Sequence, residues 1–230
     1  LKPQIDKERK NMKKIIILGT GGNCIDIFDI VSDVNLTLKT PKYVCVGFLD
    51  DNPDNLGKEM CGINVLGPLN SADKFKESFF VNGIGSPFNF WEKETIISKT
   101  GLPIERFETI VHPTACVSTM SHLGMGSVVF QNVTINSNVS IGNHVIILPN
   151  TFISHDNIIG DYTCIAGGVC ISAGVKIGKS CYLGSNCSIK GDIIIEDYCL
   201  IGIGSVVLDN VKTNSVVVGN PAKFLRNTRS

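Results

Sequence analysis

Residues 129–153 read VFQNVTINSNVSIGNHVIILPNTFI, and every sixth residue of this stretch is a branched aliphatic. The spacing continues in both directions without a miss, through seventeen positions. These are Val111, Val117, Leu123, Val129, Ile135, Ile141, Ile147, Ile153, Ile159, Ile165, Ile171, Ile177, Leu183, Ile189, Ile195, Ile201 and Val207. Helices repeat apolar residues about every 3.6 positions and strands every two, so neither explains a strict six. A hexapeptide period predicts a parallel β-helix, in which each hexad forms one side of a triangular coil.

Two other positions of the hexad agree with this prediction. The residue four places after the aliphatic is never charged, and we expect it to point inward. It is small or β-branched at Ser121, Ser127, Val133, Val139, Val145, Thr151, Thr163, Val169, Val175, Cys181, Cys187, Cys199 and Ser205. Directly after the aliphatic comes a glycine in six hexads, which predicts a tight turn there. These are Gly124, Gly142, Gly160, Gly178, Gly184 and Gly202.

Composition narrows the class of protein. Basic and acidic residues balance at 21 each, so we expect neither nucleic acid nor an anionic membrane as partner. The apolar runs are short, which predicts no membrane insertion. Nine cysteines without a C-x-x-C pair favour a reduced cytoplasm over a disulfide framework. Residues 1–11 are polar and are expected to be a disordered leader or an expression remnant.

The first hundred residues follow a different pattern. Short apolar strands are predicted at 13–18, 43–49 and 79–84, with a helix over about 24–32 after the first strand. Ser86 and Pro87 predict the start of a second helix, and Gly101 its end. The alternation predicts a Rossmann-like parallel sheet over residues 12–106. The β-helix with its C-terminal tail then occupies residues 107–230.

A glycine-rich turn, Gly19-Thr20-Gly21-Gly22-Asn23, follows the first strand. It is a weak dinucleotide motif, because the third glycine position is Cys24 and the acidic pair begins 29 residues after Gly21. A site for a nucleotide-linked sugar fits better, since Gly21, Asp50 and Gly85 all follow predicted strands of one parallel sheet. The alternative is a tight strand-to-helix turn that binds nothing.

The repeat contains or adjoins all four histidines of the chain. A zinc site of the hexapeptide type needs three imidazoles that converge. No two of the histidines occupy the same position in an 18-residue coil, so none stack on one face. They are His112, His122, His144 and His155. We therefore expect no metal site within one chain, while ligands shared between subunits stay open.

His155 differs from the other histidines because Asp156 follows it directly. A neighbouring carboxylate fixes the tautomer of an imidazole and raises its basicity, as a general base requires. The pair is thus the candidate catalytic site. The alternative is a solvated histidine at a corner of the β-helix.

With this layout, the chain resembles the left-handed β-helix sugar acyltransferases. It is most similar to the group of the sialic acid O-acetyltransferase NeuD and the bacillosamine-pathway N-acetyltransferase PglD. The resemblance runs from about Met12 to Arg226 and rests on the glycine turn, the hexads, Ser154-His155-Asp156 and the closing Gly219-Asn220-Pro221-Ala222-Lys223. It implies a left-handed prism and a homotrimer.

The resemblance also implies roles for particular residues. A histidine matching His155 acts as general base, a carboxylate matching Asp156 supports it, and the acceptor attacks acetyl-CoA directly. The nucleotide part of the acceptor binds at positions matching Gly21, Gly22, Asn23, Asp50, Asp51 and Gly85. The pantetheine arm lies between two subunits, near positions matching Cys164, Ser185 and Ile203, and Lys223 meets a CoA phosphate. This chain has Asn23 where the family commonly carries a histidine, Cys164 where some members carry a second histidine that contacts CoA, and Leu148-Pro149 where the family often has Asn-Thr.

The leading hypothesis is an acetyl-CoA-dependent, metal-free N-acetyltransferase of a nucleotide-linked amino sugar, which acts in the cytoplasm in surface glycan biosynthesis. O-acetylation of sialic acid or another sugar hydroxyl uses the same base and is the nearest alternative. A further alternative is an NAD-linked oxidoreductase built on the first domain. Such an enzyme needs a second catalytic domain, and the prism occupies the rest of this chain. The remaining alternative is a non-catalytic trimer that binds a sugar nucleotide.

Overall fold

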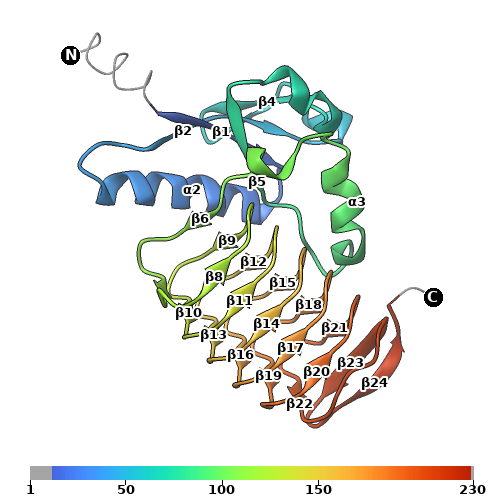
Figure 1. Cartoon of the computed structure of the whole chain (residues 1–230). Helices are drawn as coiled ribbons and strands as arrows, with labels where there is room; N and C mark the ends of the chain where they lie inside the picture. Colours follow the sequence, from blue (N-terminus) through green and yellow to red (C-terminus); the bar gives the residue numbers. More distant parts are fainter. Residues whose placement is uncertain (1–11, 229–230) are drawn as a thin grey trace. The chain divides into compact units, whose positions relative to one another are not determined.

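The computed structural model of the protein describes residues 12–228, and the predicted leader at 1–11 lies outside this range (Figure 1). The chain forms two compact units. The first holds the described residues up to Ile84 together with Thr95–Pro113, and the second holds Gly85–Glu94 together with the described residues from Thr114 onward. Within the described range, no helix combines the length and the hydropathy that crossing a bilayer requires.

The first unit is built on a five-stranded sheet with strand order β3-β4-β2-β1-β5. Its elements are β1 (Lys13–Leu18), α2 (Gly22–Thr37), β2 (Tyr43–Leu49), β3 (Glu59–Met60), β4 (Ile63–Gly67), β5 (Ser78–Asn82) and β6 (Ile110–Val111), with 3-10 turns at Pro53–Asn55, Leu69–Lys74 and Ile104–Arg106. Strand β1 lies between β2 and β5 and runs parallel to both, so that Leu18 pairs with Leu49 and Asn82. The predicted parallel α/β sheet is confirmed.

Both predicted helices differ from the sequence-based expectation in extent. Helix α2 runs on to Thr37, because the Asn35 side chain bonds the backbone of Lys42 and Tyr43 and ties the helix end to β2. The second helix, α3 (Lys93–Ser98), begins six residues later than the start predicted at Pro87, after a 3-10 turn at Phe90–Glu92.

The hexads form the prism of the second unit. Its two-residue strands are β7 (Cys116–Val117), β8 (His122–Leu123), β9 (Val128–Val129), β10 (Thr134–Ile135), β11 (Ser140–Ile141), β12 (Ile146–Ile147), β13 (Phe152–Ile153), β14 (Ile158–Ile159), β15 (Cys164–Ile165), β16 (Cys170–Ile171), β17 (Lys176–Ile177), β18 (Tyr182–Leu183), β19 (Ser188–Ile189), β20 (Ile194–Ile195), β21 (Leu200–Ile201) and β22 (Val206–Val207). Each strand ends on a residue of the predicted aliphatic series. From Val129 onward those residues are at most 3% exposed, so the predicted core is confirmed.

Strands 18 residues apart pair in parallel and build three faces (Figure 1). The first face holds β7, β10, β13, β16, β19 and β22, and the second holds β8, β11, β14, β17 and β20. The third face runs through β9, β12, β15, β18 and β21 to β23 (Ser215–Gly219) and the antiparallel β24 (Ala222–Asn227). The predicted fold class, an α/β domain followed by a parallel β-helix, is confirmed.

The corners of the prism explain two hexad positions. The residue four places after the aliphatic is buried at almost every coil, as predicted. The tight turn, however, does not fall at the glycine directly after the aliphatic. It falls two residues later, where the backbone is left-handed, for example at Asn150 (φ 62°) and Asp156 (φ 61°). The glycines are required for a different reason: a side chain at Gly184 would strike the backbone of the next coil at Ile201 and Ile203.

Candidate active site

His155 lies at the corner that joins β13 on the first face to β14 on the second. The adjacent Asn157 is fully buried and holds this corner, because its amide donates to the Ser154 carbonyl (2.7 Å) and its oxygen accepts from the Val175 N–H (2.7 Å). The His155 carbonyl accepts from the Gly174 N–H on the next coil (3.2 Å). Hydrogen bonds within its own coil and to the next coil therefore fix the backbone at His155.

The His155 and Asp156 side chains form a hydrogen-bonded pair. His155 Nδ1 lies 2.7 Å from Asp156 Oδ2, and both side chains are about half exposed, at 55% and 56%. A carboxylate only accepts hydrogen bonds, so Nδ1 carries the proton and donates it. The lone pair of the neutral imidazole is then on Nε2, which makes that nitrogen the basic one.

Asp156 is itself oriented by the preceding coil. Asn138, eighteen residues earlier at the same corner, donates to Asp156 Oδ1 (3.1 Å). Hydrogen bonds from His155 and then from Asn138 hold the pKa of the Asp156 carboxyl below its usual value. The carboxylate is thus ionised at neutral pH and supports the imidazolium that forms when Nε2 takes a proton. The sequence indicated the His155–Asp156 pair but not the contribution of Asn138.

The histidines do not gather into a metal centre. Among residues 12–228 no group of three histidine, cysteine or acidic side chains has the geometry to hold an ion. His112 Nε2 lies 3.1 Å from the Asp33 carboxylate, and the His144 ring stacks on Tyr162 with ring centroids 5.3 Å apart.

The glycine turn and Asp50 meet at one edge of the sheet in the first unit. Gly21 and Gly22 are exposed at the N-terminus of the sixteen-residue α2, and side-chain carbons added there would meet nothing within 4 Å. Thr20 Oγ1 donates to Asp50 Oδ2 (2.7 Å), and the Asn55 amide donates to Thr20 Oγ1 (3.0 Å). The open backbone N–H groups of a helix N-terminus are suited to a phosphate group. Thr20 and Asn55 were not predicted as members of this site.

The remaining candidates for acceptor contacts have different surroundings. Asn23 follows Gly22 in the first turn of α2 and is half-buried. Both Asp51 oxygens already have partners: the Leu69 N–H donates to Oδ1 (2.9 Å) and the Lys99 ammonium lies 2.8 Å from Oδ2. Gly85 belongs to the second unit, where a side-chain carbon added to it would lie 2.5 Å from Cys164 Sγ.

The four residues predicted at the CoA site are spread over the second unit. Cys164, on the third face, is only 4% exposed and lies against Lys93. Ser185 and Ile203 stand one coil apart at the corner between the third and first faces, and the Ile203 side chain is 80% exposed. Lys223 lies exposed on β24 and lines a groove of about 560 Å³ at the end of the prism. Within one chain, His155 and Ser185 therefore occupy different corners.

Family models match one segment in each half of the chain. Residues 14–89 match the PglD N-terminal domain, and residues 174–209 match the bacterial transferase hexapeptide (six repeats). The predicted resemblance to hexapeptide-repeat sugar acyltransferases of the PglD type is confirmed. No curated protein matches the chain significantly.

Several solved structures share the fold along nearly the whole chain. The acetyltransferase domain of PglB from Neisseria gonorrhoeae FA1090 is 21% identical, with a TM-score of 0.79 over 93% of this chain and 100% of that one. PerB from Caulobacter crescentus, solved in complex with CoA and GDP-perosamine, is 21% identical, with a TM-score of 0.79 over 93% and 97%. WeeI from Acinetobacter baumannii AYE is 24% identical, with a TM-score of 0.77 over 93% and 100%.

Proposed function

We propose that the protein is a cytoplasmic acetyl-CoA-dependent N-acetyltransferase that acts on a nucleotide-linked amino sugar in surface glycan biosynthesis. The observation that carries this proposal is the His155–Asp156 pair, which presents a basic Nε2 at an open corner of a hexapeptide prism. The solved complex of PerB with CoA and GDP-perosamine supports the choice of substrates.

In the proposed reaction the sugar amine attacks the thioester carbon of acetyl-CoA directly. The new C–N bond forms while His155 Nε2 takes the proton that the nitrogen loses. The C–S bond then breaks, and the imidazolium returns the proton to the departing CoA sulfur, which leaves as the thiol. Asp156 holds the imidazole by its Nδ1–H and stabilises the transient positive charge. Such a base contributes about 10²–10⁴-fold to the rate.

The first unit supplies the proposed site for the nucleotide. The N-terminus of α2 at Gly21 and Gly22 faces the diphosphate, where the helix dipole favours negative charge. Asp50, held by Thr20 and Asn55, accepts hydrogen bonds from the ribose or base. Asn23, Asp51 and Gly85 complete the proposed contacts with the acceptor.

A second copy of the chain completes the proposed site. His155 and the residues proposed to contact the pantetheine arm (Cys164, Ser185 and Ile203) lie at different places on the prism, and we propose that CoA meets them by lying between two prisms. Apolar side chains that face outward on the first two faces support such packing, with Phe152 at 40%, Ile158 at 50% and Ile194 at 45% exposure. We propose a homotrimer, with Lys223 on the CoA phosphates.

The proposal is tested by incubating the protein with acetyl-CoA and a panel of nucleotide-linked 3-amino and 4-amino sugars, with thiol release and product mass as readouts. We expect one amino sugar to gain a single acetyl group. If only sialic acid or another hydroxyl acceptor is acetylated, the function is O-acetylation and the proposed N-acetylation is wrong. If no acceptor causes thiol release from acetyl-CoA, the remaining hypothesis is a non-catalytic trimer that binds a sugar nucleotide.

A further inference from the structure

Residues 85–94, here called the strap, lie on the third face of the prism within the second unit. Phe90 is fully buried, and its ring centroid lies 6.0 Å from that of Tyr182 on β18. Glu94 pairs with Lys179 at 3.1 Å. Gly85, at the other end of the strap, lies so close to Cys164 that a side-chain carbon would collide with its sulfur.

Lys93 is the least expected residue of the strap, because its side chain is 0% exposed. Its ammonium donates to the His144 carbonyl (2.6 Å) and contacts Cys164 Sγ (3.4 Å). None of the ion pairs found among the described residues joins Lys93 to a carboxylate. Burial lowers the pKa of Lys93, which reflects the cost of placing a charge away from water.

An apolar side chain of similar length would fill the same space without this desolvation cost. It would not, however, donate a hydrogen bond to one particular carbonyl of the prism, as Lys93 does to that of His144. The backbone of the prism repeats about every 4.8 Å, although the outward residues of this face differ from coil to coil, and a repeating backbone by itself defines register weakly. A short hydrogen bond from a buried ammonium to one particular carbonyl does define it, as single buried polar groups do in coiled coils.

The carbonyl that Lys93 selects lies at the level of the catalytic candidate. His144 lies two residues before β12, where the coil that contains His155 begins, and Cys164 begins the next coil. The two contacts of Lys93 thus bracket His155 in the chain. A slip of the strap by one coil would move Gly85 by about 4.8 Å along the prism. That exceeds the tolerance of an attack, in which the reacting atoms approach to about 3–3.5 Å.

We propose that Lys93 is a positioning residue for the acceptor: it fixes the strap at the level of the coil that carries His155, and so holds Gly85, a proposed acceptor contact, at that level. This inference rests on the proposed function.

The first test replaces Lys93 by methionine, which keeps the length of the side chain and removes the donor. We expect kcat to fall at least tenfold and KM for the sugar nucleotide to rise, while KM for acetyl-CoA stays unchanged. Trp91, the sole tryptophan of the chain, lies in the strap with its ring 5.1 Å from that of Phe90 and reports on it directly. Acrylamide quenching of its fluorescence is expected to increase in Lys93→Met.

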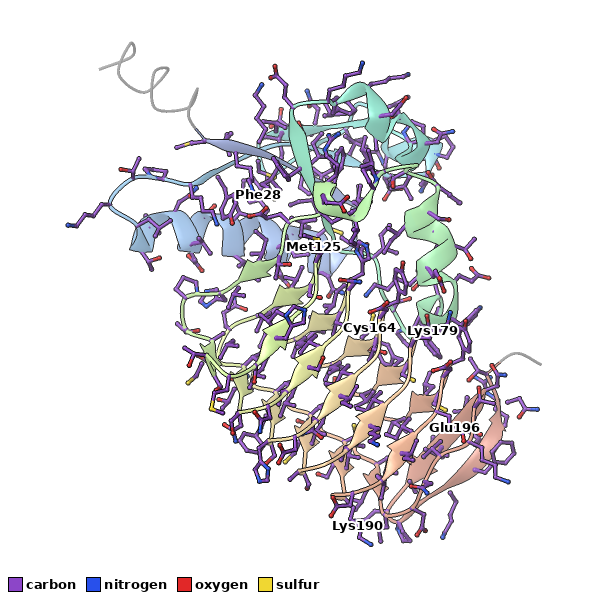
Figure 2. All side chains as sticks on the ribbon, in the orientation of Figure 1. Phe28, Met125, Cys164, Lys179, Lys190 and Glu196 are labelled. Atoms are coloured by element: carbon purple, nitrogen blue, oxygen red, sulfur yellow. The ribbon has the colours of Figure 1, made fainter. Side chains whose placement is uncertain are left out.

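The matched control is Lys190→Met, because Lys190 is an exposed lysine in the turn after β19 (Figure 2). It is expected to leave kcat and quenching unchanged. Lys93→Gln, which retains a shorter neutral donor, is expected to lie between Lys93→Met and the unaltered protein. Wild-type kcat and quenching in Lys93→Met would overturn the proposal. A lower melting temperature together with a loss of kcat and a rise of KM for both substrates would also overturn it. Failure of both Lys93 variants to fold would do the same, because either result indicates a purely structural role.

The quenching measurement and hydrogen exchange of residues 85–94 do not depend on activity. If no acceptor is acetylated, the proposed function fails while the anchoring of the strap is still tested by these two readouts. If acetyl transfer is found but Lys93→Met leaves the strap and kcat unchanged, only the present inference fails.

Discussion

His144 is a titratable group that the fold keeps neutral. Its side chain is buried, its ring lies nearly parallel to that of Tyr162 (interplanar angle 11°), and its backbone is left-handed (φ 55°). Burial, and to a smaller degree the charge of Lys93, lowers the pKa of His144 to about 4 from an ordinary value of 6.5.

The depressed pKa predicts a particular loss of stability in acid. Above pH 6.5 His144 is neutral in both the folded and the unfolded chain, so it adds no pH dependence. Between pH 6.5 and about 4 the unfolded chain takes up the proton and the folded chain does not, so the free energy of unfolding falls by up to about 3 kcal/mol. Urea denaturation across this range measures it.

His144→Asn is the matched variant for this measurement, because asparagine tolerates the left-handed backbone and occupies the same hexad position at Asn132, Asn138 and Asn150. We expect its stability to change less between pH 6.5 and 4. An identical slope in both proteins would contradict the assignment to His144.

At the residue scale, sequence reasoning found pairs that are close in the chain. His155 and Asp156 are neighbours, and their hydrogen bond follows from that adjacency together with the corner. It missed Lys93, whose partners His144 and Cys164 lie 51 and 71 residues away. No local pattern distinguishes a lysine that will be buried in a folded chain from one on the surface.

At the scale of elements, the coils approach one another so closely that the glycine directly after the aliphatic has no room for a side chain. Atoms of the next coil lie 2.7 Å from a side-chain carbon placed at Gly184, both at the Ile201 carbonyl oxygen and at the Ile203 nitrogen. These are backbone atoms, so they move only if the coil itself moves.

Gly184→Ala is therefore expected to lower the free energy of unfolding by about 1–3 kcal/mol, as overpacking commonly does. Gly22→Ala is the control for stability, since a side chain there meets nothing within 4 Å and alanine favours the helix that begins at Gly22. Chemical denaturation of both variants measures their free energies of unfolding and tests this expectation. A Gly184→Ala protein as stable as the unaltered chain would show that the coils can separate at no cost.

The strand bounds of the prism could be predicted from the sequence because each strand ends on an aliphatic residue that the period identifies. The start of α3 could not. Ser86 and Pro87 carry the local signals of a helix start, but the Asn89 side chain accepts from both the backbone and the hydroxyl of Ser86 and holds a turn there. Phe90 and Lys93 are fully buried against the prism, which further fixes the conformation of this segment.

At the scale of the whole molecule, each unit carries part of the proposed chemistry. The first presents the N-terminus of α2 and Asp50 at one sheet edge, and the second presents His155 at a prism corner. The period predicts a prism that stacks, but it does not state which corners a partner covers.

The measurement that tests the central claim most directly is acetyl transfer by His155→Ala, made on protein whose mass and CoA binding are determined in the same preparation. The account predicts a mass three times the 24.8 kDa of one chain, unchanged binding of acetyl-CoA, and a rate of transfer lower by at least about 10². Full activity in His155→Ala would contradict the assignment of His155 as the general base and with it the proposed mechanism.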